Sequence, residues 1–302
     1  MCKKCFIKSI EYKAKKTMSK YSMIKHGDTL AVAVSGGKDS LVLLNILKKI
    51  FSNSNPELLA ITVDEGIKGY RDESLNIVKN FCTNIGVENR IMSFSELFGL
   101  SMDDAMALRP SEKISSCGIC GTFRRRVLDL LAESCGANVV ATGHNLDDYI
   151  QTFLINLFAG DVERIGWTYP EAVEYGMTNL RKIKPLMEIY EREIVLYAIL
   201  MNIPIQSEEC PYKDESIRSA FRIHLNNLEK MHPGIKYNAY SSILKIAKKV
   251  KFANSQNVLD VNKVVQYGNK RCIICNRDSS NRICSVCRTL DLLVNETQTR
   301  TR

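Results

Sequence analysis

The sequence has no stretch of about eighteen consecutive apolar residues, which is the length that a membrane-spanning helix needs. Its first residues, MCKKCFIKSIEYK, carry lysine from the third position and lack the apolar segment of a secretory signal. Internal repeats and long low-complexity segments are also missing. We therefore expect a globular cytoplasmic protein that has no membrane partner.

Positive charge and cysteine are both plentiful. Lysine and arginine outnumber aspartate and glutamate by 42 to 33, which suits an anionic partner such as RNA. The chain has 11 cysteines, although disulfides are rare in a reducing cytoplasm. Most of them form CxxC pairs, a pattern that favours metal sites: Cys2/Cys5, Cys117/Cys120, Cys272/Cys275 and Cys284/Cys287.

Short apolar runs alternate with helical patterns over roughly the first half of the chain. Strands are predicted at 29–34, 58–63, 90–93 and 138–143, with helices following them, among others at 72–85, 125–134 and 145–158. This alternation predicts an α/β fold, a parallel twisted sheet with helices on both faces. From about residue 188 the pattern becomes mostly helical.

The hexapeptide SGGKDS (residues 35–40, the nucleotide loop) lies between the first predicted strand and a helix. Its two glycines allow a tight turn and close approach to a ligand, and the amides of the helix N-terminus attract phosphate. The spacing is too short for the NTPase P-loop. A plain glycine turn would explain Gly36 and Gly37, but not the Ser, Lys, Asp and Ser crowded around them.

The nucleotide loop resembles the signature of the PP-loop ATP pyrophosphatases, which adenylate a substrate and release pyrophosphate. The resemblance implies an adenine nucleotide alpha hydrolase-like fold that binds ATP with Mg²⁺. It places nucleotide contacts at Ala33, Val34, Ser35, Gly36, Gly37, Lys38, Asp39, Ser40, Val63 and Gly143. Asp39 is also expected to be catalytic. Asp148 is an ordinary helix-opening carboxylate by position, and the resemblance makes it a candidate magnesium or substrate residue.

Two cysteines stand directly before three arginines in SSCGICGTFRRR (115–126). Cys117 and Cys120 could ligate zinc, form a redox pair or hold an iron–sulfur cluster, and CxxC alone does not choose. Cys210 precedes a proline, as a cysteine of ferredoxin clusters also does. It follows the pair by about ninety residues, so only the fold can bring the three together.

Five motifs occur in the order found in the tRNA 2-thiouridine synthetases of the TtuA/NcsA type: SSCGICGTFRRRVLD, ATGHNLDD, IKPL, EECPY and LNNLEKMHPGIKY. The chain resembles that family from about residue 28 to 290. The resemblance implies that Cys117, Cys120 and Cys210 hold a 4Fe-4S cluster with one iron free of protein ligands. It also implies that Arg124 contacts the ATP phosphates.

The implied activity is an ATP-dependent tRNA sulfurtransferase. Adenylation of a uridine oxygen makes AMP the leaving group, and an open iron can aim sulfide at the activated carbon. We prefer this to a cysteine persulfide relay. The wobble uridine is favoured over the T-loop uridine; a PP-loop ligase with a nitrogen nucleophile and a non-enzymatic zinc RNA-binding protein are the other readings. The sulfur donor is either free sulfide or a ubiquitin-like thiocarboxylate carrier, and relatives suggest a homodimer.

CIICNRDSSNRICSVC, near the C-terminus, places two CxxC pairs eight residues apart. Four thiolates at this spacing predict a tetrahedral structural Zn²⁺ site made by Cys272, Cys275, Cys284 and Cys287. Relatives commonly open with CxxC and a CxxH half, but the second half is missing here. Cys2 and Cys5 are therefore weaker candidates for zinc: the finger is degenerate, borrows ligands or binds nothing.

These patterns divide the chain into five parts. The expected parts are a short N-terminal segment with the Cys2/Cys5 half-finger (1–27), a PP-loop catalytic domain (28–210), a helical extension (211–265), a zinc-binding module (266–292) and a tail (293–302).

Overall fold

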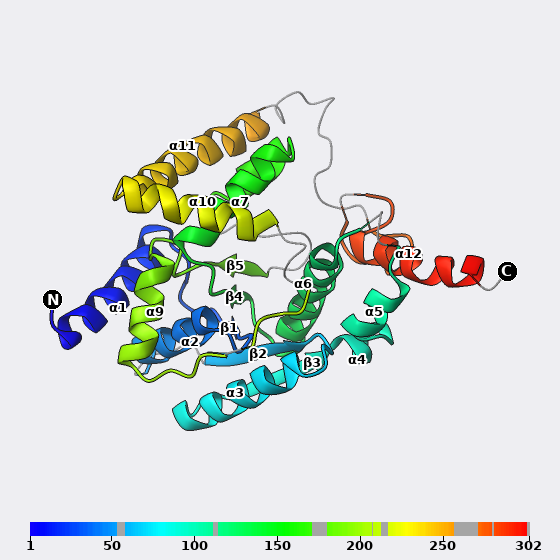
Figure 1. Cartoon of the computed structure of the whole chain (residues 1–302), viewed down its shortest axis with the longest axis horizontal. Helices are drawn as coiled ribbons and strands as arrows, with labels where there is room; N and C mark the ends of the chain where they lie inside the picture. The colour runs from blue at the N-terminus through cyan, green and yellow to red at the C-terminus, as the bar shows by residue number, and fades with distance from the viewer. Residues whose placement is uncertain are drawn as a thin grey trace.

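The computed structural model describes residues 1–52, 58–110, 114–170, 180–206, 208–212, 217–256, 271–279 and 281–300. At its centre lies a sheet of five parallel strands in the order β3-β2-β1-β4-β5 (Figure 1). The strands are β1 (Leu30–Ala33), β2 (Leu58–Asp64), β3 (Asn89–Ser93), β4 (Val139–Ala141) and β5 (Arg181–Ile183). The predicted parallel α/β sheet is confirmed.

Helices connect the strands and continue beyond them to the C-terminus. Their bounds are α1 (Lys3–Lys20), α2 (Lys38–Ile50), α3 (Tyr70–Ile85), α4 (Phe94–Phe98), α5 (Met102–Leu108), α6 (Ser116–Ser134), α7 (Leu146–Phe158), α8 (Val162–Trp167), α9 (Glu191–Leu200), α10 (Ile217–Met231), α11 (Ile235–Gln256) and α12 (Ser285–Arg300). Among the described residues, no helix combines the length and the hydrophobicity that crossing a bilayer requires.

Side chains alternate along each strand and so point to both faces of the sheet, and helices cover each face. Leu30 and Val32 of β1 belong to the larger core, together with buried side chains of α2, α3, α7 and α9. Ala31 belongs to the smaller core on the other side, where it packs with Leu131 and Ala132 of α6. α6 is thus the helix that covers the second face.

Three elements differ from the prediction. The N-terminal segment is the long helix α1, whose Ile10, Ala14 and Met18 are buried in the larger core. α6 begins at Ser116 instead of near residue 125, so the CxxC pair lies inside the helix. β5 was not predicted, because three residues, RKI, give too short an alternation to recognise.

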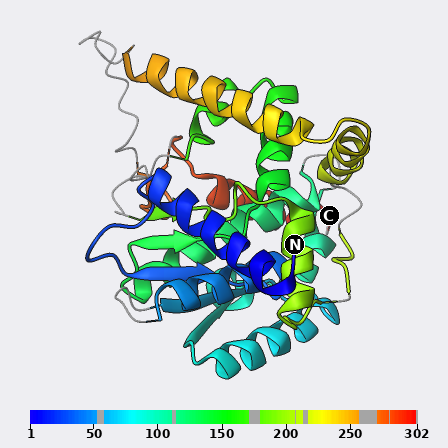
Figure 2. The same ribbon diagram turned by 90° about the vertical axis from the view of Figure 1, so that its left-hand side faces the viewer.

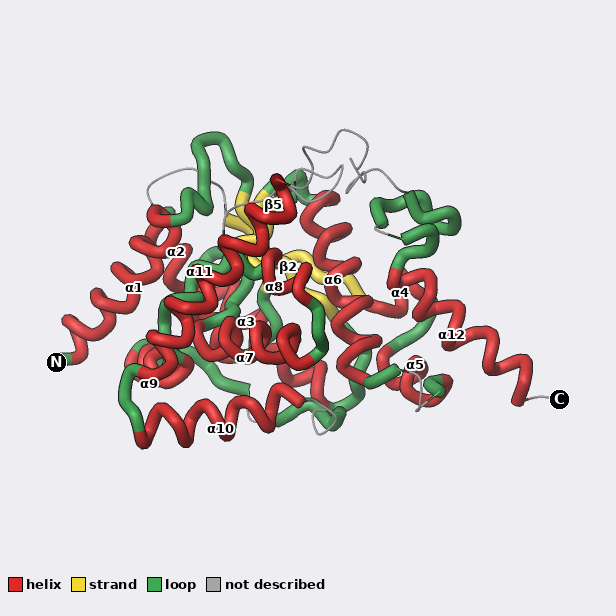
Figure 3. Tube along the Cα trace, turned by 90° about the horizontal axis from the view of Figure 1, so that it is seen from above, coloured by secondary structure: helices red, strands yellow, loops and turns green. Residues whose placement is uncertain are grey.

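The helical extension and the C-terminal part pack onto different sides of this unit. α10 and α11 contact α7, and α11 also contacts α8, so that they lie at the opposite side of the molecule from α3 (Figure 2). α12 contacts α5 and α6, and seen from above it lies at the far end from α1 (Figure 3). The five-part division stays a prediction, and residues 257–270 lie outside the described residues.

Candidate functional site

The strand order reverses between β1 and β4, the position at which open parallel sheets hold ligands beyond their carboxyl ends. The loops that follow these strands meet there. A Cβ atom on Gly143 would lie 2.9 Å from the backbone of Asp39 and of Ser40. In addition, Asn145 Nδ2 donates to Asp39 Oδ1 at 3.1 Å. The loop after β4 and the nucleotide loop therefore form one surface.

The nucleotide loop is held in shape by its own residues. Gly36 has φ +89°, and a Cβ there would lie 2.7 Å from Ser74 Cβ, so both backbone and space require glycine. Ser40 Oγ donates to the Gly37 carbonyl at 2.8 Å and accepts from the Ser35 amide at 3.1 Å. The loop leads directly into α2, whose first amides have no partner within the helix. This geometry suits an anionic phosphate group.

Lys38 lies between two carboxylates. Its Nζ is 3.0 Å from Asp39 Oδ2 and 2.9 Å from Glu191 Oε1. Burial alone would lower the pKa of Lys38, but the two carboxylates outweigh it and the net pKa is raised. The ammonium group therefore stays charged beside the loop, as contact with a polyphosphate requires.

A buried ion cluster that was not predicted joins the ends of β1 and β2. Glu65 is 2% exposed and its Oε2 lies 2.7 Å from Arg71 Nε. Arg71 also donates to the carbonyl oxygens of Ser35 and Val63. The only signal in the sequence was the position of Glu65, directly after a buried strand, with Arg71 six residues on at the start of a helix.

Arg124 lies on the other side of the same carboxylate. Its Nε donates to Glu65 Oε1 at 2.7 Å, and its second guanidinium nitrogen donates to Cys120 Sγ at 3.2 Å. The side chain is 46% exposed, so it also faces solvent. The expected phosphate contact of Arg124 stays a prediction; its protein contacts connect the carboxylate with a cysteine.

The three cysteines expected at the cluster, the sulfur site, come from two segments. Cys117 and Cys120 lie in the first turns of α6, and Ser115 caps that helix by accepting from the Gly118 amide at 3.2 Å. Ser116 Oγ donates to the Tyr212 carbonyl at 3.4 Å, which brings the segment of Cys210 to the start of α6.

The thiols of the sulfur site act on one another electrostatically. Burial raises the pKa of Cys120 to about 11, opposed by Arg124 and reinforced by Cys210 and Cys117. The Sγ atoms are not packed as tightly as ligands of one ion, since in the described part of the chain only the C-terminal quartet has three or more ligand atoms within 4.8 Å. Three thiols from two segments are a donor set that an iron–sulfur cluster takes, and their role as cluster ligands stays a prediction.

The helix α7 begins at this edge of the sheet with Asp148 in a reciprocal cap with Asn145. Burial raises the pKa of Asp148 to about 6, while Arg218, 3.6 Å away, opposes the shift. His144 contacts Thr142 Oγ1 through Nδ1 at 2.8 Å, which fixes the loop. The charge of Asp39 adds to the raised pKa of Asp148, so the two carboxylates lie within electrostatic reach of each other.

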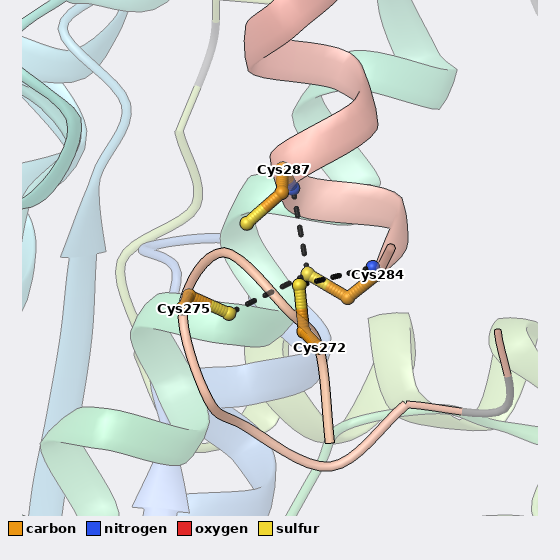
Figure 4. Close-up of side chains that lie close together, drawn as sticks. All are labelled: Cys272, Cys275, Cys284 and Cys287. Carbon is orange, nitrogen blue, oxygen red and sulfur yellow. Dashed lines mark hydrogen bonds between the residues drawn. The ribbon is translucent and has the colours of Figure 1, made fainter. Parts of the chain in front are cut away.

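The C-terminal cysteines form a compact quartet made by Cys272, Cys275, Cys284 and Cys287 (Figure 4). Cys275 Sγ and Cys284 Sγ lie 3.7 Å apart, close to the edge of about 3.8 Å that four Zn–S bonds give in a tetrahedron. Burial opposes ionisation of Cys272, but backbone amides donated by Cys284 and Cys275 lower its pKa to about 6. The geometry fits a four-thiolate metal ion.

Arg126 connects this four-cysteine module (residues 271–287) to α6. Its guanidinium donates to Cys275 Sγ and to Cys284 Sγ, each at 3.6 Å. The module also packs on Phe123 and Ile119 of α6 in a single hydrophobic core. The last of the three arginines that follow Cys120 is thus held by the module.

The N-terminal pair is isolated. Cys2 and Cys5 are exposed at the start of α1. No third ligand atom joins them among the described residues within 4.8 Å. Their role as zinc ligands stays a prediction.

Comparison with known proteins agrees with this geometry. Residues 7–229 match the family model of the PP-loop domain. The chain is 35% identical over 295 residues to cytoplasmic tRNA 2-thiolation protein 1 of Saccharomyces cerevisiae, covering 96% of this chain and 80% of that relative. It is equally identical over 291 residues to a probable sulfurtransferase of Methanocaldococcus jannaschii, covering 95% and 81%.

Among solved structures, the U34-tRNA thiolase NcsA from Methanococcus maripaludis with its 4Fe-4S cluster superposes with a TM-score of 0.78 at 31% identity, covering 96% of this chain and 88% of that one. The family model spans most of the chain and the relatives align over nearly all of it. The chain therefore belongs to the PP-loop family and, within it, to the tRNA 2-thiolation proteins.

Proposed function

We propose that this protein is an ATP-dependent tRNA sulfurtransferase that makes 2-thiouridine, at the wobble uridine in preference to the T-loop uridine. One observation carries the proposal. The nucleotide loop is connected through Arg71, Glu65 and Arg124 to Cys120, so a base activated at the sheet edge would lie beside the sulfur site. A ligase that uses a nitrogen nucleophile would not need the three cysteines of the sulfur site.

The residues of the nucleotide loop would hold ATP, with Lys38 and the first amides of α2 on the phosphates. The uridine O2 attacks the α-phosphorus, the bond to pyrophosphate breaks, and the base carries AMP on oxygen. Sulfur then forms a bond to C2, the C2–O bond breaks and AMP leaves with the oxygen. Lys38 and the amides of α2 would stabilise the negative charge that develops on the phosphates during this transfer, because they are already oriented toward it.

Cys117, Cys120 and Cys210 would hold the 4Fe-4S cluster, which when bound supplies an iron site that presents sulfide. The chain would ligate it from α6 and from the segment of Cys210, with Arg124 donating a hydrogen bond to one of the ligands, Cys120. Asp39 and Asp148 are the proposed magnesium residues, since two carboxylates near a triphosphate suit Mg²⁺. Zn²⁺ is the proposed ion of the four-cysteine module.

The proposed setting follows from the relatives. The yeast relative is named a cytoplasmic tRNA 2-thiolation protein, which supports a cytoplasmic location and tRNA as the substrate. Free sulfide or a ubiquitin-like thiocarboxylate carrier would donate the sulfur, and the protein would act as a homodimer.

The cluster ligands are tested by comparing two cysteine variants after anaerobic purification. Cys210→Ser should lose most of the iron and labile sulfide and all thiolation, because it removes one of three ligands. Cys135→Ser, at the other end of α6, should keep both. Equal iron in the two variants, or zinc without iron in the wild type, would contradict the proposed ligand set.

A further inference from the structure

A single buried carboxylate connects the two halves of the site. Glu65 accepts from Arg124 Nε through Oε1 at 2.7 Å, and its Oε2 lies 2.7 Å from Arg71 Nε. Glu65 and Arg71 are 2% and 3% exposed. The carboxylate therefore faces both guanidinium groups at once, a buried one on Arg71 and a half-exposed one on Arg124.

Each guanidinium group continues the connection to a different half. Arg71 donates to the carbonyl oxygen of Ser35, at 2.8 Å, just beyond β1, and to that of Val63, the next-to-last residue of β2, at the proposed nucleotide site. Arg124 donates to Cys120 Sγ at 3.2 Å, in the sulfur site. The planar fork of arginine suits such use, because it makes several directed hydrogen bonds from one fixed group.

The energetic argument favours a shared role over two independent pairs. A buried charge whose partner is removed is strongly destabilised, because its desolvation is no longer compensated. If Glu65 loses its charge, Arg71 stays buried without a counterion and must shift toward water or toward the carbonyl groups. The backbone of Ser35 and Val63 then moves with it, while Arg124 loses the contact that aims it at Cys120.

We propose that Glu65 is a positioning residue that couples the nucleotide loop to the sulfur site, by fixing Arg71 on the strand ends and Arg124 on a cysteine of that site. The inference rests on the proposed function and extends it to Glu65 and Arg71, which are not among the residues proposed to bind the triphosphate or the cluster. Glu65 sets the distance between the activated base and the sulfur.

The test uses two readouts that belong to different halves. Glu65→Gln keeps the shape and removes the charge. In cluster-loaded protein this substitution should speed the release of iron to a chelator about tenfold, the lower end of the effect seen when a residue that supports a metal ligand is changed. In cluster-free protein it should weaken ATP binding by a similar factor of about ten. Glu88→Gln breaks the exposed pair of Glu88 with Arg90 and should change neither.

Coupling is separated from simple destabilisation by a second substitution. Arg71→Lys touches only the nucleotide half, so its effect on iron release must pass through Glu65. It should speed iron release in the wild-type background and add nothing in the Glu65→Gln background. Val78→Ala, which opens a cavity where α3 packs into the larger core, serves as the control for lowered stability.

The inference is overturned if Arg71→Lys leaves iron release unchanged, if Glu65→Gln alters only one readout, or if Val78→Ala reproduces both changes. Should Glu65→Gln fail to fold, Arg71→Lys alone decides, because it retains the charge. A wild-type protein that binds neither iron nor ATP would contradict the proposed function itself, which is a different result.

Discussion

At the scale of single residues, the site depends on positions whose surroundings leave no room for an added methyl group or disfavour a charge. Gly36 combines a positive φ with a backbone in contact with Ser74, and Gly143 packs against the backbone of the nucleotide loop. Asp148 carries a carboxyl group in a site that disfavours its charge. Each of these residues is recognisable in the sequence by its motif, but the physical constraint on it becomes visible only in the fold.

Gly36→Ala should abolish ATP binding, since the added methyl group meets Ser74 Cβ at 2.7 Å and the backbone has φ +89°. We expect a loss of stability of about 1–3 kcal/mol from the strained backbone, and more from the contact. Isothermal titration with ATP and thermal unfolding measure the two effects. Gly86→Ala, at φ +62° with open space around it, should lose stability but still bind ATP. Equal ATP affinity in both variants would contradict this account of the loop.

Asp148→Asn should stabilise the metal-free protein at neutral pH. Burial raises the folded pKa of Asp148 to about 6, above the value of about 3.9 in an unfolded chain. The folded state therefore binds this proton more tightly, so its contribution to stability is present below about pH 4 and is lost as pH rises through about 6. Asparagine avoids that loss.

The expected gain is roughly 2–3 kcal/mol at pH 7.5, and it should vanish near pH 4. Chemical denaturation at the two pH values measures it. Asp161→Asn, at the partly exposed cap of α8, should not show the pH-dependent gain. A gain that persists at low pH would show that burial of the charge is not the cause.

At the scale of elements, α6 organises the chemistry. Its first turns carry Cys117 and Cys120, its middle carries Arg124, and Arg126 contacts the four-cysteine module. The module packs on the same helix through Phe123 and Ile119. The metal proposed for the module would thus stiffen the helix on which the sulfur site is built.

Arg126→Leu should loosen the metal of the four-cysteine module. It removes two N–H···S contacts from Cys275 and Cys284, and such contacts commonly change metal affinity about 10-fold or more. Zinc release into a colorimetric dye follows this loss. Arg125→Leu is the matched control, because Arg125 contacts Thr122 instead of the module. If both variants release zinc at the same rate, the link between α6 and the module is wrong.

Periodicity and motif predicted much of the fold and site. The strands at β1, β2 and β4 were recognisable because each is a buried apolar run before a glycine- or acid-rich turn. α1 was missed because its apolar residues, such as Ile10 and Ala14, are diluted by lysines. Glu65 and Arg71 were missed, because their burial and the contact of Arg71 with Ser35, beyond the neighbouring strand, depend on the folded arrangement of the sheet.

At the scale of the whole molecule, the parallel sheet brings together segments that are distant along the chain. The strand order places β1 and β2 side by side, with the carboxyl end of β2 facing α6. The segment of Cys210, which follows β5 and α9 along the chain, lies at the start of α6. A base activated at the sheet edge would therefore be close to the sulfur that we propose the three cysteines hold.

The direct test of this arrangement is the ratio of AMP to 2-thiouridine formed by cluster-loaded protein with ATP, sulfide and tRNA under anaerobic conditions. Nucleoside mass spectrometry, mapped to position, counts the product. The account predicts one AMP for each 2-thiouridine, formed at the wobble position and dependent on Cys210. AMP released without thiolated tRNA, or thiolation that survives Cys210→Ser, would contradict it.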